Sequence, residues 1–255
     1  MSQHLVFHKQ TIYSSFFINI KTVPEYKTFN ELEKNNTNLA QTWLEIQRKK
    51  DSSSFTYETN AQYYPEFAKI VTISFGVCNI LEDGTIVKNI KKISDDEVKV
   101  IRLFSDILNR AYNHNKNYIL VGHNINGFHI PMFIRRFIKH NEKLTIKVKK
   151  DNGEIEEQKL QLPPLIKNAV MAKPWDRNVI DTLDTWKFGG NDYTSLSTIA
   201  TYMALDIDYE KNLLHEIDND MLGSIYYSND KDTVATFAAN EIEILMKLLL
   251  ELRKI

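Results

Sequence analysis

Four aspartates in the second half of the chain carry side chains suited to binding a divalent cation. Asp181 and Asp184 follow a short apolar run, and Asp230 and Asp232 stand where a long C-terminal helix is expected to begin. Carboxylate oxygens are the ligands that Mg²⁺ and Mn²⁺ prefer, so one metal ion could be held among them if the fold brings them together. The favoured alternative is that each one caps a helix or forms an ion pair.

Four other polar side chains could contact a phosphate or move a proton. Lys21 follows the apolar run Thr11–Ile20, and its ammonium group is a good point-charge partner for phosphate. His129 could act as a general base, and His123 and Asn124 precede it. The alternatives are a lysine that points to solvent, a hydrogen-bonded histidine at a helix start, and a helix cap with ordinary loop structure.

Composition limits the classes of protein that are possible. The 255 residues are 43% hydrophobic and 25% charged, with a formal net charge of −1, which excludes disorder and gives no charge footprint of a dedicated nucleic-acid binder. The single cysteine, Cys78, excludes an intrachain disulfide and is expected to be a buried structural thiol. No apolar run reaches about 18 residues and no secretory signal is visible, so we expect a cytoplasmic protein without a membrane contact.

The order of elements predicts a mixed α/β fold. Strands are expected at Thr11–Ile20, closed by Pro24, at Ile70–Ile80 with Thr85–Ile90 as a hairpin, and at Tyr118–Val121. Helices are expected within residues 28–50, after the acidic start Ser94–Glu97, at Met132–Ile138 and at Thr233–Leu252. The basic residues Arg135, Arg136 and Lys139 would form either a phosphate-tracking face or a solvated helix face.

One segment resembles a protruding hairpin. Lys143–Lys150 and Glu154–Leu162 flank Asp151-Asn152-Gly153, and Asn-Gly is a strong signal for a tight turn. The first arm is basic and the second is acidic near the turn, so cross-strand charge pairs would fix the register. The hairpin is either a solvated feature or a contact surface for a protein partner.

Several motifs in order along the chain resemble those of the DnaQ-type 3′-5′ exonucleases, in particular the group related to the exonuclease domain of family B DNA polymerases. They are FINIKTVPEY (Phe17–Tyr26), YYPEFAKIVTISFG (Tyr63–Gly76), GHNINGFHIP (Gly122–Pro131), AKPW (Ala172–Trp175), and VIDTLDTWKFGG (Val179–Gly190) with TSLSTIATYMAL (Thr194–Leu205). The resemblance implies a ribonuclease-H-like α/β fold, with a mixed sheet flanked by helices. It also implies a single exonuclease-like domain over residues 1–255, with an inserted hairpin at 143–162.

The resemblance implies a metal-dependent chemistry whose ligands are replaced here. Four carboxylates of such enzymes hold two magnesium or manganese ions, about 4 Å apart. The first three ligand positions are occupied here by Asn19, Lys21 and His129. Asparagine is a weak neutral ligand, an ammonium group cannot ligate, and histidine is a poor ligand for magnesium.

The last ligand of the family belongs to a Tyr-x-x-x-Asp motif, which we expect within Ser224–Phe237. Three alignments remain open: Tyr226 with Asp230, Tyr227 with Lys231, or Ser228 with Asp232. At most one carboxylate of the family's set is therefore preserved.

The leading hypothesis is a degenerate exonuclease that binds without cleaving, needs no cofactor, and takes single-stranded DNA or RNA 3′ ends, a protein partner through residues 143–162, or both. Nucleic acid would contact Lys21, Thr22, His123, Asn124 and His129. One alternative is an active enzyme with a relocated Mg²⁺ or Mn²⁺ site at Asp181, Asp184, Asp230 and Asp232. The other is a structural interaction module without affinity for nucleic acid. The oligomeric state stays open.

Overall fold

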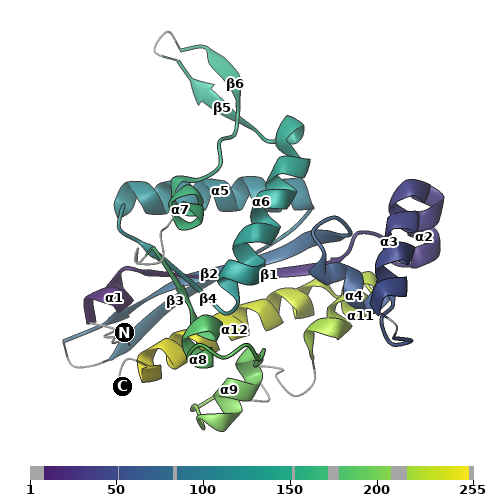
Figure 1. The fold of residues 1–255 in the computed structure, drawn as a ribbon. Helices are drawn as coiled ribbons and strands as arrows, with labels where there is room; N and C mark the ends of the chain where they lie inside the picture. The colour runs from purple at the N-terminus through teal and green to yellow at the C-terminus, as the bar shows by residue number, and fades with distance from the viewer. Residues whose placement is uncertain are drawn as a thin grey trace.

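A five-stranded mixed sheet forms the centre of the protein (Figure 1). The structure is a computed structural model that describes residues 9–50, 52–82, 85–150, 153–171, 178–207 and 217–252. The strand order is β3-β2-β1-β4-β7; β1, β2 and β3 pair antiparallel, and β4 and β7 continue from β1 in parallel. The strands are β1 (Ser15–Pro24), β2 (Ala68–Ile80), β3 (Ile86–Ser94), β4 (Ile119–Gly122) and β7 (Val179–Asp181). The predicted α/β class is confirmed, and the arrangement is compatible with a ribonuclease-H-like fold.

Helices cover both faces of the sheet. One face carries α5 (Glu97–His114), α6 (Ile130–Lys139) and α7 (Pro164–Val170), and the other carries α9 (Leu196–Tyr202) and the long α12 (Lys231–Leu252). The remaining α-helices are α1 (Lys9–Tyr13), α2 (Phe29–Asn35), α3 (Thr37–Lys50), α4 (Tyr57–Asn60), α8 (Thr182–Lys187) and α11 (Leu222–Tyr227). No helix in the described ranges is long and apolar enough to cross a membrane.

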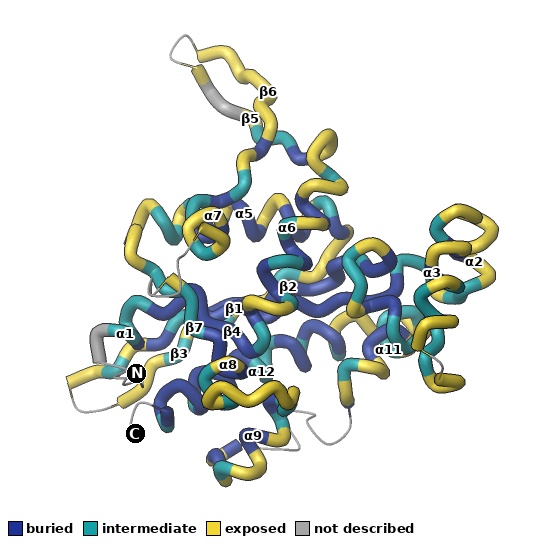
Figure 2. Tube along the Cα trace, viewed as in Figure 1, coloured by how far each residue is buried: buried dark blue, intermediate teal, exposed yellow. Residues whose placement is uncertain are grey.

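Strand β1 is buried along its whole length and therefore sets the two cores (Figure 2). Because side chains of a strand alternate between its faces, Phe16, Ile18 and Ile20 enter the core beneath α5 and α6. The opposite series begins with Phe17 in the core beneath α12. It continues with Asn19 and Lys21, which are 6% and 5% exposed. The sequence of β1 thus places two polar side chains inside a closed interface.

The predicted first strand is shifted along the chain. Residues 9–13 form the short helix α1, and β1 begins at Ser15, whose hydroxyl donates to the carbonyl of Thr11 (2.7 Å) as the helix ends. The apolar run could not reveal this break because Ile12 is buried in helical form against the same core. The strand ends at Pro24, as predicted.

The other predicted elements are confirmed, with two refinements. Residues 28–50 form two helices, α2 and α3, which break at Asn36, where the backbone is not helical. The hairpin of β2 and β3 is present, although residues 83 and 84 of its predicted turn lie outside the described residues. Cys78 is a buried thiol without a disulfide partner, as expected.

The predicted hairpin is present and projects from the body (Figure 1). It consists of β5 (Thr145–Lys149) and β6 (Ile155–Lys159). Its base is anchored by Leu144 and Leu160 in the core beneath α5 and α6. Lys150 pairs with Glu156 across the hairpin at 3.2 Å, in agreement with the expected charge pattern, while Asp151 and Asn152 lie outside the described residues.

A buried ion cluster joins α5, α6 and β2. The carboxylate of Glu97 accepts hydrogen bonds from Arg136 Nε (2.8 Å) and Nη2 (2.5 Å), from His140 Nε2 (2.7 Å) and from the backbone N–H of Ile70 (2.7 Å). Burial alone would raise the pKa of Glu97, but the hydrogen bonds from His140 and Arg136 outweigh it and hold that pKa below its ordinary value. Arg136 is 1% exposed, so neither interpretation of a basic surface face holds for this residue.

We predict that Arg136→Met lowers the free energy of unfolding by about 3–5 kcal/mol, because it leaves the buried Glu97 without its charged partner. Urea unfolding followed by circular dichroism measures this. Arg135→Met is the matched control, since Arg135 is exposed one position earlier on the same helix, and it should change stability by less than about 0.5 kcal/mol. Equal effects of the two substitutions would contradict the role of the cluster.

Candidate functional site

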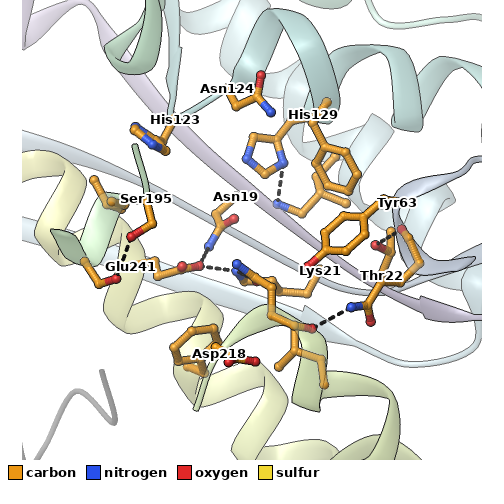
Figure 3. A pocket seen from close by; sticks show the side chains of 18 of the residues that line it. Asn19, Lys21, Thr22, Tyr63, His123, Asn124, His129, Ser195, Asp218 and Glu241 are labelled. Atoms are coloured by element: carbon orange, nitrogen blue, oxygen red, sulfur yellow. Dashed lines mark hydrogen bonds and ion pairs between the residues drawn. The ribbon is translucent and has the colours of Figure 1, made fainter. Parts of the chain in front are cut away.

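A cavity of about 540 Å³ opens beside the second half of β1 (Figure 3). It is bordered by β1, by the loop that follows β4, by residues 193–197 and 217–222, and by α12. The side chains predicted to contact nucleic acid come from distant parts of the sequence, and all of them border this cavity: Lys21, Thr22, His123, Asn124 and His129. Thr22 is already engaged, because its hydroxyl donates to the carbonyl of Gln62 (2.7 Å).

Lys21 is the charged residue at the floor of the cavity. Its Nζ forms an ion pair with the carboxylate of Glu241 on α12, and both side chains are largely buried, at 6% and 12% exposure. The same ammonium group donates to Asn219 Oδ1 (2.6 Å) and lies 4.7 Å from the centre of the Phe237 ring. The interpretation that Lys21 points to solvent is therefore wrong.

Asn19 binds the same carboxylate from the neighbouring position on β1. Its Nδ2 donates to Glu241 Oε2 (2.6 Å) and to the backbone carbonyl of Ala238 (3.1 Å). One glutamate of α12 thus binds both polar side chains that β1 points toward that helix, as Figure 3 shows.

Glu241 is not among the residues that the sequence predicted for the Tyr-x-x-x-Asp motif. The residues proposed for it, Tyr226, Tyr227, Ser228, Asp230 and Asp232, are not among those that border the cavity in the described structure. Phe237 and Glu241 have the same four-residue spacing as Tyr-x-x-x-Asp, with phenylalanine for tyrosine and glutamate for aspartate. They lie nine to eleven residues beyond the three alignments considered above. A second signal was available, because Glu241 interrupts the buried stripe of α12 between Phe237 and Leu245.

The proposed residues of that motif have local structural partners instead. Tyr227 donates its hydroxyl to the carbonyl of Pro24 (2.8 Å), and the ring of Tyr226 lies 4.9 Å from Lys69 Nζ. Asp230 accepts a hydrogen bond from the backbone N–H of Thr233 (3.1 Å), and Asp232 pairs with Lys92 (2.9 Å).

His129 is held in its neutral form. Its Nδ1 accepts a hydrogen bond from the backbone N–H of Ile20 (3.2 Å), which fixes the ring against β1. Burial, together with the positive charge of Lys21, lowers the pKa of His129 to about 3. A neutral imidazole gives the cavity no positive charge near pH 7.

His123 and Asn124 shape the opposite wall. The carbonyl of Thr194 can only accept, so His123 Nε2 carries the proton of their 2.8 Å hydrogen bond, and Nδ1 accepts from the hydroxyl of Thr182 (3.0 Å). Asn124 has a left-handed backbone (φ 59°). A Cβ at Gly127 would lie 2.4 Å from Asn124 Oδ1, so a larger residue there would displace the Asn124 side chain.

Asp181 organises that loop. Oδ1 accepts from the backbone N–H groups of Asn124 (2.8 Å) and Leu183 (3.0 Å), and Oδ2 accepts from that of Asn126 (2.9 Å). Burial raises the pKa of Asp181, although these hydrogen bonds act in the opposite direction. The favoured structural interpretation, a cap, describes these contacts.

The residues present do not fit a pair of divalent cations. Around the ligand positions that the resemblance implies stand Asn19, Lys21, His129 and Glu241, which supply one carboxylate together with an ammonium group bound to it. In the described ranges, no three His, Cys, Asp or Glu side chains are grouped as a metal ion would require. The arrangement of Asp181, Asp184, Asp230 and Asp232 therefore gives no support to a relocated metal site.

We predict that Lys21→Met destabilises the protein by about 3–5 kcal/mol, because Glu241 would keep a buried charge without its cation. The double variant Lys21→Met/Glu241→Met should lose less than the sum of the single variants, as measured in a double-mutant cycle by urea unfolding. Lys88→Met is the control, since Lys88 pairs with Glu243 on the same helix near the surface, and should cost at most about 1 kcal/mol. Additive losses at Lys21 and Glu241 would contradict a coupled pair.

We also predict an acid-dependent loss of stability that depends on His129. The folded state keeps this ring neutral down to about pH 3, whereas the ring in the unfolded chain takes up a proton below its ordinary pKa of 6.5. The neutral ring therefore costs no stability above pH 6.5. Below that pH the free energy of unfolding falls by about 1.4 kcal/mol per pH unit. His129→Asn keeps an acceptor near Nδ1 and should flatten this slope, measured by urea unfolding between about pH 6.5 and pH 4. His114→Gln, at an exposed position, should leave the slope unchanged.

Comparison with solved structures gives similarities of fold. No protein-family model matches the sequence, and no curated protein matches it. The fold is similar to that in the structure of the family B DNA polymerase from the hyperthermophilic archaeon Pyrobaculum calidifontis, with a TM-score of 0.50 and 14% identity over 93% of this chain. This chain covers 24% of the length of that polymerase chain. The likeness shows a similarity of fold to part of that polymerase.

Proposed function

We propose that this chain is a binding protein built on an exonuclease-like fold, and that it does not hydrolyse phosphodiester bonds. The observation that carries the proposal is the ion pair between Lys21 and Glu241 on the floor of the cavity. The ammonium group of Lys21 binds the carboxylate of Glu241, which a metal ion would need as a ligand. The lysine side chain therefore takes the place of a bound cation.

The energetics of the floor favour the loss of metal chemistry. A divalent cation that approached Glu241 would meet the charge of Lys21, and the ion pair would have to separate in a buried environment. Asn19 adds a neutral amide whose Nδ2 already faces the carboxylate at 2.6 Å. The carboxylate of Glu241 is therefore neutralised without a metal.

Single-stranded nucleic acid is one candidate ligand for this binding protein. The similar structure is that of a DNA polymerase, and all five predicted contact residues border one cavity. Phosphate contacts make affinity fall steeply as salt rises, so the salt dependence of binding to a labelled single strand tests this class. The hairpin β5–β6 as a contact surface for a protein stays a separate prediction.

We predict that the native chain leaves a 3′-labelled single strand intact in magnesium and in manganese. The triple variant Asn19→Asp/Lys21→Glu/His129→Asp places three carboxylates around Glu241 and should bind manganese and shorten the strand. Denaturing gel electrophoresis measures the shortening, and calorimetry measures the metal binding.

The matched control adds Glu241→Gln to the triple variant, which removes the fourth carboxylate and should abolish the gain. Metal-dependent degradation by the native chain, lost when Asp230 or Asp232 is changed to Asn, would overturn the proposal and favour the relocated metal site.

A further inference from the structure

The cavity carries a negative formal charge. The described residues that border it supply one ammonium group, from Lys21, against three carboxylates, from Asp218, Asp220 and Glu241, a formal charge of −2 with both histidines neutral. Burial lowers the pKa values of His123 and His129, so neither ring offsets this charge near pH 7. An anionic ligand would meet net repulsion here, and a cationic one net attraction.

Two of these carboxylates form an exposed acidic rim, Asp218 and Asp220. Asp218 Oδ1 accepts from the backbone N–H groups of Asp220 (2.9 Å) and Met221 (3.2 Å), which fixes the rim as a short capped turn. Asp220 Oδ1 accepts from the hydroxyl of Tyr63 (2.5 Å). Within the described ranges, no lysine, arginine or histidine pairs with either carboxylate. The rim is therefore rigidly placed but not neutralised.

Aromatic rings border the same cavity. Tyr63 and Phe128 meet edge to face at 6.4 Å, and Tyr193 meets His123 at 6.2 Å. Aromatic faces attract cations, most strongly where water is displaced. Lys21 shows this recognition within the protein, because its ammonium group is bound by a carboxylate, an amide oxygen and the ring of Phe237.

A buried acceptor without a partner points to the same kind of ligand. Gln62 is 1% exposed and borders the cavity, and its Nε2 donates to the carbonyls of Thr59 (3.1 Å) and Asn219 (2.8 Å). Its Oε1 is buried and has no hydrogen-bond partner within the described residues. A buried acceptor left unpaired costs stability, so a donor that reached Oε1 would be favoured there.

Three donors close to the cavity are already used within the protein. The backbone N–H groups of Asn124 and Asn126 point to the carboxylate of Asp181, and Nε2 of His123 donates to the carbonyl of Thr194. Two of the three N–H donors of Lys21 are engaged, by Glu241 and Asn219. The cavity offers carboxylates, an amide oxygen and rings, which is the chemistry that binds a guanidinium group.

We propose that this cavity binds the side chain of an arginine presented by a polypeptide partner, with its guanidinium group between the acidic rim and the ring of Tyr63. This inference rests on the proposed function, since it names the ligand of the same non-hydrolytic site. Arginine fits better than lysine because its planar head stacks on an aromatic ring while donating in-plane hydrogen bonds.

The test uses the full-length chain and Nα-acetyl-arginine amide, which has no charged ends, in an NMR titration of the tyrosine ring signals. The neutral isostere Nα-acetyl-citrulline amide is the ligand control. We expect saturable shifts with the arginine compound alone, and affinity about threefold to tenfold lower in Asp218→Asn/Asp220→Asn. Asp106→Asn, which removes a carboxylate paired with Arg110 on α5, should bind like the native chain.

Three results would overturn the inference: no shifts with the arginine compound, equal shifts with citrulline, or unchanged affinity in the rim variant. A further arm titrates a ten-residue thymidine oligonucleotide. If the oligonucleotide shifts the same rings and binds more tightly once the rim is neutralised, the cavity is a nucleic-acid site. All these outcomes are separate from the degradation assay, so the arginine site can fail while the absence of hydrolysis stands.

Discussion

The central constraint on this protein is that β1 has no face in contact with solvent. A strand that is buried on both sides can carry a charge only if a partner reaches it through the core. Glu241 on α12 is that partner, and it binds both Lys21 and Asn19. The position of α12 against the sheet, and the shape of the cavity beside it, follow from this shared carboxylate together with the apolar contacts around it.

Polar groups in the walls of the cavity are also bound by partners within the protein. Asp181 holds the loop after β4 through three backbone donors, and His129 accepts the N–H of Ile20. These groups look chemically active in the sequence, yet each has a structural task in the fold. Some groups could still bind a ligand. The rim carboxylates of Asp218 and Asp220 have no cationic partner in the described ranges, and Gln62 Oε1 has no hydrogen-bond partner there.

Much of the fold could be predicted from the sequence because its signals are local. The helix start at Asp96, the hairpin of β5 and β6 and the long α12 follow from caps, turns and periodicity. The site was predicted in part: positions 19, 21 and 129 converge as expected, but Glu241 was missed. The role of Glu241 depends on its contacts with Lys21 and Asn19, which are distant in the sequence. The sequence near Glu241 indicates only that one glutamate interrupts an apolar stripe. The burial of Arg136 was not predicted for the same reason, because its partner Glu97 lies on another helix.

The shared carboxylate also has a consequence for the history of such a sequence. A change of Lys21 to an acidic residue would place two carboxylates against each other in the core, and a neutral residue at 241 would leave the lysine without its carboxylate. Each single step toward a metal-binding arrangement therefore passes through a less stable protein. Selection for stability would therefore disfavour the separate loss of either partner of this pair.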